Sequence, residues 1–320
     1  MADRAGLDTG TRQRLVPAVR GQLVMLRFIW MILAVWLLAL PVQARPATVF
    51  YQPQNRDARL ADSDWQTLFR TVRQAGFDTL LVQWTRWGEE NFGGRDGWLA
   101  RAVEQARDAG LAINLGLYAD PQFFRWIQQD GTELDIELAR YARETLATAR
   151  AWSASGAVQA WYLPAELDDL HWQQAGKRAR LMATLSAIRS GLPATLHPAG
   201  ISAFFTGQSS PAQLQRWYGE LQQQGWQVWV QDGAGTRALT AAQRKSYLDA
   251  LFACPQQAGT PALVLEAFRQ TSAADTPFAA IPASPAQWQA QTRETRSLCP
   301  SATGVFSLRY LPQASGYLQP

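Results

Sequence analysis

The sequence predicts a (β/α)₈ barrel that forms one domain over residues 45–320, preceded by an N-terminal extension and signal peptide over residues 1–44. Two observations predict this fold. After residue 44, eight apolar strand-like runs alternate with seven helical patterns, over a length close to the roughly 250 residues of such barrels. The first run is followed by Gln52-Pro53-Gln54-Asn55, whereas a doubly wound sheet usually has a glycine-rich turn at that place.

The strand-like runs are short, apolar and bounded by polar, glycine or proline residues, as expected for buried parallel strands. We expect strands over 47–54, 78–85, 112–120, 159–166, 194–200, 227–231, 262–268 and 304–311.

The helical patterns carry start and stop signals. Asp62 or Ser63 and Ser284 are typical N-cap residues, and Gly76, Gly110 and Gly225 are typical of the residue after a helix. We expect helices over 62–75, 97–109, 134–155, 175–190, 211–224, 240–253 and 285–297.

The N-terminal segment has the pattern of a signal peptide. A continuous apolar run over 28–40 follows Arg20 and Arg27 and precedes small residues that suit cleavage after Ala44. The run is short for a membrane span, although an uncleaved anchor is the alternative and would be the only membrane association. Translation could also start at Met25 instead of the first residue. We therefore expect a periplasmic or secreted protein.

Charge and motifs exclude several function classes. The chain has a net charge of +4, of which the first 44 residues supply +3, so the basic charge does not predict nucleic-acid binding. Gly-x-Ser-x-Gly and Walker motifs are absent, which argues against a serine hydrolase or a nucleotide cofactor. His171 and His197 have no metal-ligand spacing with cysteines, so no metal is expected. We expect no cofactor and a monomer, although no sequence feature fixes the oligomeric state.

The chain has two cysteines, Cys254 and Cys299, and each precedes a proline just before an expected strand. In a barrel these two loops are neighbours on one rim. An exported protein meets an oxidising compartment, so a disulfide between them is expected; two unpaired, buried thiols are the alternative.

Carboxylates gather at the ends of two expected strands. Glu166, Asp168 and Asp169 follow the fourth strand, and Glu266 ends the seventh. Alternation of side chains lets both glutamates face the barrel mouth. Glycosidic hydrolysis needs one protonated carboxyl and one ionised carboxylate. We expect the two aspartates to raise the pKa of Glu166, making it the general acid/base, and Arg269 to hold Glu266 ionised as nucleophile or base. Rim ion pairs are the alternative role for both glutamates.

Other polar and aromatic residues at the strand ends are candidates for substrate binding, because flat rings stack on sugars and polar groups bond their hydroxyls. Most of the 14 Trp should nevertheless pack in the core. Asp232, in Gln-Asp-Gly-Ala-Gly, either contacts a ligand or forms an Asx turn. The candidates are Gln83, Trp84, Arg86, Trp87, Tyr118, Asp120, Asp168, Asp169, Gln231, Asp232, Arg269 and Tyr310.

Four motifs carry a resemblance: LLVQWT over 80–85, WYLPAELDD over 161–169, VQDGAG over 230–235 and LEAFR over 265–269. Across 47–315 the chain resembles a family of exported bacterial glycoside-hydrolase-like barrels of unknown function. More distantly it is similar to the clan of retaining TIM-barrel glycosidases. That resemblance implies an acid/base at the end of strand four and a nucleophile at the end of strand seven, where Glu166 and Glu266 fall. The clan usually has Asn before the acid/base, whereas this chain has Ala165, which puts the retaining mechanism in question.

These observations predict a glycoside hydrolase acting on a cell-envelope or extracellular polysaccharide. A non-catalytic polysaccharide-binding barrel is the first alternative, and a structural or assembly protein of an envelope complex is the second. The sugar, the anomer, and endo or exo cleavage are not determined by the sequence.

Overall fold

The computed structural model describes residues 47–153, 158–254, 260–273, 278–300 and 303–320. The predicted signal peptide, its cleavage after Ala44 and the alternative start at Met25 lie outside the described residues. Among the helices of the described ranges, none combines the length and the apolar character that crossing a bilayer requires.

Eight parallel strands form a closed barrel, which confirms the predicted fold class. Thr48 aligns with Gly304 on one side and with Thr79 on the other, so the first strand closes the barrel between the last and the second. The barrel strands, in chain order and in spatial order, are β1 (Thr48–Tyr51), β2 (Thr79–Val82), β4 (Ala112–Gly116), β6 (Val158–Leu167), β7 (Ala199–Ala203), β8 (Trp226–Gln231), β9 (Ala262–Glu266) and β12 (Gly304–Phe306).

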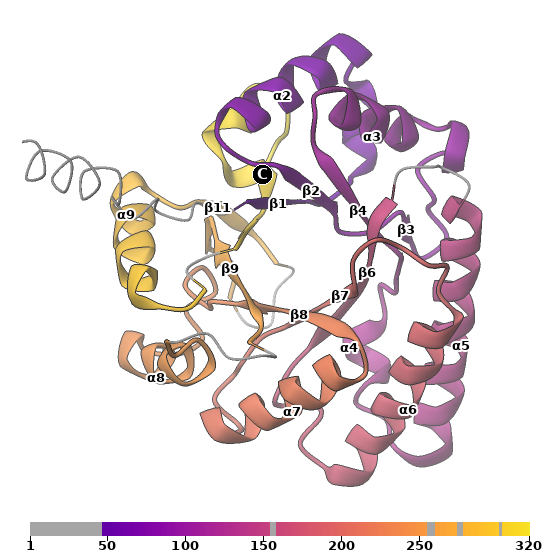
Figure 1. The fold of residues 1–320 in the computed structure, drawn as a ribbon, viewed down its shortest axis with the longest axis vertical. Helices are drawn as coiled ribbons and strands as arrows, with labels where there is room; N and C mark the ends of the chain where they lie inside the picture. The colour runs from indigo at the N-terminus through magenta and orange to yellow at the C-terminus, as the bar shows by residue number, and fades with distance from the viewer. Residues whose placement is uncertain (1–46, 154–157, 255–259, 274–277, 301–302) are drawn as a thin grey trace, which may run out of the picture. The chain divides into compact units, whose positions relative to one another are not determined.

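Helices surround the barrel on its outer side (Figure 1). Asp130, Ser210, Thr240 and Ser284 each accept a backbone N–H at the start of a helix, as N-caps do. The α-helices of the described residues are α2 (Asp62–Gln74), α3 (Trp98–Asp108), α4 (Phe123–Trp126), α5 (Gly131–Trp152), α6 (Ala175–Gly191), α7 (Pro211–Gln223), α8 (Ala241–Leu251) and α9 (Pro285–Glu294).

Short 3₁₀ turns lie between these elements: η1 (Asn55–Arg59), η2 (Gly94–Asp96), η4 (Thr295–Ser297), η5 (Leu308–Tyr310) and η6 (Pro312–Ala314). The prediction of a strand over 304–311 was therefore wrong beyond Phe306. Arg309 donates to the backbone carbonyl of Gln52 at 2.7 Å and pairs with the buried Asp57, and these contacts hold η5 beside the end of β1.

The fifth strand lies later in the chain than predicted. The range 194–200 was expected, but the strand is β7, which begins at Ala199. Pro198 has no N–H for the ladder, so the strand starts after it. His197, which lies inside the predicted range, consequently precedes the strand at the amino end of the barrel.

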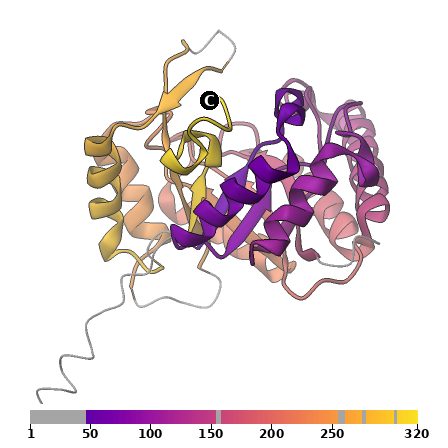
Figure 2. The ribbon, with the colours of Figure 1, turned by 90° about the horizontal axis from the view of Figure 1, so that it is seen from above.

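Two small sheets stand at the carboxyl end of the barrel. The predicted strand 78–85 ends early, at Val82, and Arg86–Trp87 just beyond the predicted range form β3. The predicted strand 112–120 is interrupted after Gly116, and Tyr118–Ala119 form β5, which pairs with β3 in parallel. After β9, the antiparallel pair β10 (Phe268–Gln270) and β11 (Ala280–Pro282) forms a hairpin. Figure 2 shows this hairpin in orange, standing out from the barrel.

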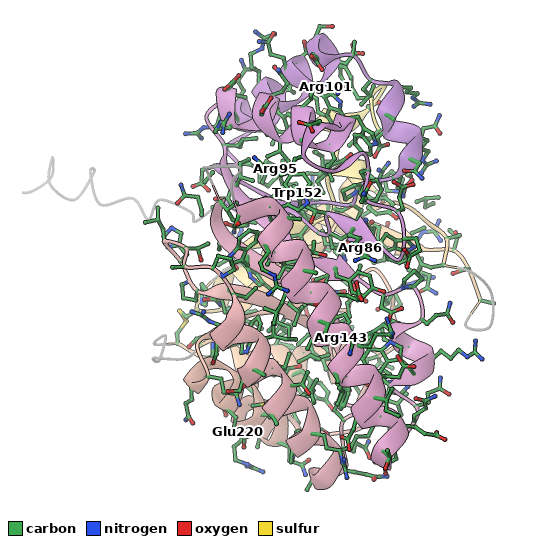
Figure 3. All side chains as sticks on the ribbon, turned by 90° about the vertical axis from the view of Figure 1, so that its right-hand side faces the viewer. Arg86, Arg95, Arg101, Arg143, Trp152 and Glu220 are labelled. Atoms are coloured by element: carbon green, nitrogen blue, oxygen red, sulfur yellow. A yellow bond between two sulfur atoms is a disulfide. The ribbon has the colours of Figure 1, made fainter. Side chains whose placement is uncertain are left out.

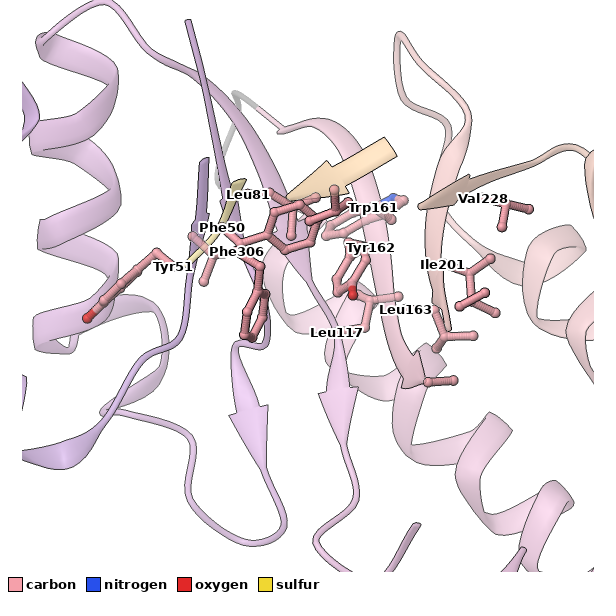
Figure 4. Packing of buried hydrophobic residues seen from close by; sticks show 14 of the residues in the cluster. Phe50, Tyr51, Leu81, Leu117, Trp161, Tyr162, Leu163, Ile201, Val228 and Phe306 are labelled. Atoms are coloured by element: carbon pink, nitrogen blue, oxygen red, sulfur yellow. The ribbon is translucent and has the colours of Figure 1, made fainter. Parts of the chain in front are cut away.

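Aromatic side chains fill the barrel interior. The ring of Phe50 lies 5.7 Å from that of Tyr162, 5.6 Å from that of Trp229 and 5.9 Å from that of Phe306, centroid to centroid. Phe50, Tyr162 and Phe306 lie together in Figure 4. These contacts join β1, β6, β8 and β12 across the barrel and identify the strand positions that point inward.

Cys254 and Cys299 are joined by a disulfide with a Cα–Cα distance of 5.1 Å. The bond ties the segment after α8 to the segment after η4. The backbone N–H of Cys299 also donates to the carbonyl of Phe252 at 2.8 Å, so the two segments are joined by a hydrogen bond as well.

Candidate active site at the carboxyl end of the barrel

Glu166 reaches the barrel mouth through a bulge in β6. Tyr162 aligns with Gly200 and Glu166 with Ser202, so β6 has two more residues than β7 over this stretch. Pro164 lies within the bulge and, having no N–H, cannot donate to the ladder. Because Gly200 and Ser202 are two residues apart, Glu166 stays on the inward side with Tyr162.

The surroundings of Glu166 favour its protonated form. The side chain is half-buried, and Gln83 Nε2 donates to its Oε1 at 3.4 Å. Burial and then the negative charge of Asp168 raise the pKa of Glu166 to about 7, while the amides of Gln231 and Gln83 oppose the shift. A carboxyl with such a pKa can donate and take back a proton near neutral pH.

Glu266 ends β9 and is more deeply buried, with a relative exposure of 1%. It aligns with the inward-facing Phe306. Its Oε2 accepts the backbone N–H groups of Gly235 and Thr236, at 2.6 and 3.1 Å. Oε1 of Glu266 accepts no hydrogen bond from the described residues, so this oxygen is the one that could react with a ligand.

The expectation that Arg269 holds Glu266 ionised was wrong. Burial and the negative charge of Asp232 raise the pKa of Glu266 to about 8, and Glu166 adds to this shift. Arg269 lies on β10, where its backbone pairs with Ile281. Arg269 is not among the groups that shift the pKa of Glu266, and the groups that lower this pKa are the backbone N–H groups of Gly235 and Thr236.

Asp232 is fully buried and serves the protein interior. Its Oδ1 accepts the backbone N–H groups of Ala234 and Glu266, each at 3.2 Å. Its Oδ2 accepts Nε2 of Gln291 at 2.6 Å and lies 3.5 Å from Nη1 of Arg244. With a relative exposure of 0%, the carboxylate has no surface for a sugar. The hydrogen bond from the Ala234 N–H to Asp232 Oδ1 is the Asx turn that was the alternative role predicted for Asp232.

The two aspartates after Glu166 hold loops. Asp168 accepts the backbone N–H groups of Leu170 and His171 and lies 2.8 Å from Nδ1 of His171. Asp169 accepts four donors from the segment 206–209, including the hydroxyl of Thr206 at 2.7 Å. Both carboxylates are 1% exposed. Asp168 thus acts on Glu166 through its charge, whereas Asp169 fixes the loop after β7.

The residues after β2 form an aromatic and basic edge. Trp84 and Trp87 lie 4.6 Å apart, centroid to centroid, and Trp87 is 41% exposed. Arg86 lies beside α5, where its Nη1 donates to Glu144 at 2.7 Å (Figure 3). The Arg86 guanidinium also lies 5.0 Å from the ring centre of Tyr118. Trp84 packs against the core and donates its Nε1 to the carbonyl of Pro53, so of the two tryptophans Trp87 is the exposed one.

Three further candidates are occupied within the protein. Tyr118 and Asp120 both contact Arg140 of α5, and Asp120 also accepts Nε1 of Trp126 at 3.0 Å. Tyr310 belongs to η5 and packs its ring 5.3 Å from that of Phe268. These contacts fix the rim around the site.

Sequence reasoning missed Arg244 and Gln291, which reach the site from α8 and α9. Both are buried polar residues on helices, 8% and 5% exposed. Gln291 could have been noticed in the sequence, because it lies on the inner side of a predicted helix, where an apolar residue is usual. Within the described residues, no group of three or more His, Cys, Asp or Glu has an arrangement that would hold a metal ion.

Comparisons with known proteins agree with this architecture. A putative alpha-L-fucosidase from Bacteroides thetaiotaomicron aligns with a TM-score of 0.60 at 14% identity, covering 87% of this chain and 90% of that one. An endoxylanase of family GH10 from a sugarcane soil metagenome aligns with a TM-score of 0.45 at 9% identity, covering 85% and 88%. At 14% identity, the likeness to the first of these structures concerns the fold alone.

Two sequence comparisons identify the family. The uncharacterized protein YbcH of Escherichia coli (strain K12) is 37% identical over 299 residues, which are 92% of this chain and 100% of that protein. The family described as a domain of unknown function, DUF4434, matches residues 48–306, which include the whole barrel. The chain therefore belongs to the DUF4434 family.

Proposed function

We propose that this protein is an exported glycoside hydrolase that cleaves a cell-envelope or extracellular polysaccharide. One observation carries the proposal: Glu166 and Glu266 point inward from the carboxyl ends of the fourth and seventh barrel strands and interact electrostatically. Catalytic groups of such barrels lie at this end, and paired carboxyls are what glycosidic cleavage requires.

In the proposed reaction, Glu166 donates a proton to the leaving oxygen, and Glu266 Oε1 attacks the anomeric carbon or activates water. The two backbone N–H groups on Oε2 orient Glu266 and stabilise its ionised form. Glu266 has the higher pKa, about 8 against about 7 for Glu166, so between these values the remaining proton lies mainly on Glu266. The reactive form is the minor one in which that proton lies on Glu166, and the alkaline limb of the pH profile reports mainly on Glu266. We therefore expect a bell-shaped pH profile of kcat/KM with its maximum between about pH 7 and 8.

A buried, unpaired acceptor also supports a hydroxyl-rich ligand. Gln83 is 3% exposed, and its Oε1 has no hydrogen-bond partner among the described residues. Such atoms are rare in folded proteins. Since Gln83 Nε2 contacts Glu166, a sugar hydroxyl beside Glu166 would supply the missing donor.

Export rests on the predicted leader and on the Cys254–Cys299 disulfide, which suits an oxidising compartment. An exported glycosidase meets polymers of the envelope or its surroundings, and this sets the substrate class. Ala165 is 1% exposed and has no polar group that could bond the sugar. The anomeric configuration of the product would therefore distinguish a retaining from an inverting mechanism.

The test is hydrolysis of a panel of bacterial and plant polysaccharides by residues 45–320, measured as released reducing ends. Glu166→Gln and Glu266→Gln are run in parallel, and Glu220→Gln, an exposed carboxylate on α7, is the matched control. We expect both site variants to lose turnover and the control to retain it. If both site variants still release reducing ends, the assignment of Glu166 and Glu266 as catalytic residues is refuted.

A non-catalytic polysaccharide-binding barrel is the second candidate, because Glu266 is almost fully buried while Trp87 is open to solvent. This alternative predicts that the native protein binds one polysaccharide of the panel without turnover. Binding would then survive both glutamine variants but would weaken on Trp87→Ala.

A further inference from the structure

A buried polar cluster lies behind Glu266, on the side away from the barrel mouth. It consists of Asp232 at the end of β8, Arg244 on α8, and Gln291 and Glu294 on α9. Asp232, Arg244 and Gln291 are 0%, 8% and 5% exposed. The proposed reaction assigns no task to any of the four.

The cluster holds both peptide groups of Glu266. The backbone N–H of Glu266 donates to Asp232 Oδ1 at 3.2 Å, and its carbonyl accepts Gln291 Nε2 at 3.3 Å. The same Nε2 donates to Asp232 Oδ2 at 2.6 Å. One amide therefore joins the aspartate to the backbone of the glutamate, and β8, β9 and α9 are locked together at this residue.

Asp232 also shapes the loop that holds the carboxylate. Its Oδ1 accepts the N–H of Ala234 at 3.2 Å, which turns the chain so that Gly235 and Thr236 direct their N–H groups at Glu266 Oε2. Gly235 has no room for a side chain, because a Cβ there would lie 2.6 Å from the carbonyl oxygen of Phe268. The backbone and the side chain of Glu266 are thus both set from Asp232.

The charges of the cluster alternate outward from the site. Glu266 faces Asp232 and, across the barrel, Glu166. Asp232 faces Arg244, and Arg244 pairs with Glu294. Loss of the Asp232 charge would therefore act on Glu266 directly, whereas changes on the outer surface of α8 or α9 would not.

We infer that Asp232 is a positioning residue for Glu266, acting together with Gln291, and that it does not bind the substrate. The inference rests on the proposed function for its effect on turnover, but the positioning itself is a property of the folded chain. This positioning role replaces the role in substrate binding that we predicted for Asp232 from its place at the end of a strand.

The variants are Asp232→Asn, Gln291→Met and, as a control on α8, Asp249→Asn, whose exposed carboxylate pairs only with Lys245 among the described residues. We expect Asp232→Asn to lower kcat about tenfold to a hundredfold with KM nearly unchanged, and to move the alkaline limb of the pH profile toward acid. Gln291→Met should lower kcat without removing the charge, so the alkaline limb should move less. Asp249→Asn should leave all parameters unchanged.

Carbon-13 NMR of glutamate carboxyls measures the effect without a substrate. Glu266→Gln assigns the signal, and its titration is followed in the native protein and in Asp232→Asn, with thermal unfolding as the folding check. We expect the apparent pKa of Glu266 to fall in Asp232→Asn. A fall without any hydrolysis by the native protein would support the positioning and refute the proposed function. An unchanged pKa, or a loss confined to KM, would overturn the inference while leaving the hydrolysis intact.

Discussion

Replacing Glu266 with glutamine should remove one of the two large losses of stability that the native fold undergoes between weakly acidic and neutral pH, Glu166 being the source of the other. The pKa of Glu266 is raised from an ordinary value of 4.5 to about 8 by burial and by Asp232. The folded chain therefore holds this proton more tightly than the unfolded chain does. Stability contributed by the protonated form is complete below about pH 4.5 and is lost as pH rises toward about 8.

The size of the effect follows from the shift. Each pH unit within that window costs about 1.4 kcal/mol, so this one group lowers the free energy of unfolding by about 3 kcal/mol between pH 4.5 and 7. Glutamine keeps the shape, and its carbonyl oxygen can accept the two N–H groups of Gly235 and Thr236. We therefore expect Glu266→Gln to be nearly equal to the native protein at about pH 5 and clearly more stable near pH 8.

The assay is urea unfolding followed by tryptophan fluorescence, at intervals from about pH 5 to 8. Glu220→Gln serves as the control, because its exposed carboxylate lies in solvent on α7. The control should follow the native curve throughout, while Glu266→Gln should diverge upward from it as pH rises. Parallel curves for the native protein and Glu266→Gln would refute the burial and charge argument for this residue.

Three further changes test the rim and the loops. Gly235→Ala places a Cβ 2.6 Å from the carbonyl oxygen of Phe268; we expect urea unfolding to show a loss of roughly 1–3 kcal/mol, and unchanged stability would contradict that contact. Cys254→Ser opens a loop with a sequence separation of 45, and calorimetry should show a loss of about 4 kcal/mol; an unchanged Tm would mean that Cys299 is unpaired in solution. Trp87→Ala should raise KM about tenfold, or about 1.4 kcal/mol, with kcat kept, if this exposed ring stacks on the sugar; equal KM values would remove it from the site.

Much of the architecture could be predicted because it depends on local patterns. Apolar runs and helix stop signals are short-range features, and Gly76 and Gly110 adopt the left-handed φ of 100° and 85° that ends α2 and α3. The errors arose where a local pattern continued past its structural end. The apolar run at 304–311 looks like one strand, but contacts of Arg309 with Gln52 and Asp57 bend its second half into a turn.

The amino-acid sequence was enough to predict the fold class and the position of Glu166 and Glu266 at the ends of the fourth and seventh barrel strands. It could do so because hydrophobic periodicity sets the strands, and strand ends in a closed barrel share one rim. It favoured the pairing of Cys254 with Cys299, with unpaired thiols as the alternative, and the structure contains the disulfide. Only the tertiary structure decided the partners of Glu266, since backbone N–H groups of Gly235 and Thr236 have no sequence signature. Gln291, too, reaches the site only because α9 packs behind β9, a contact between residues 25 apart that burial in three dimensions makes possible.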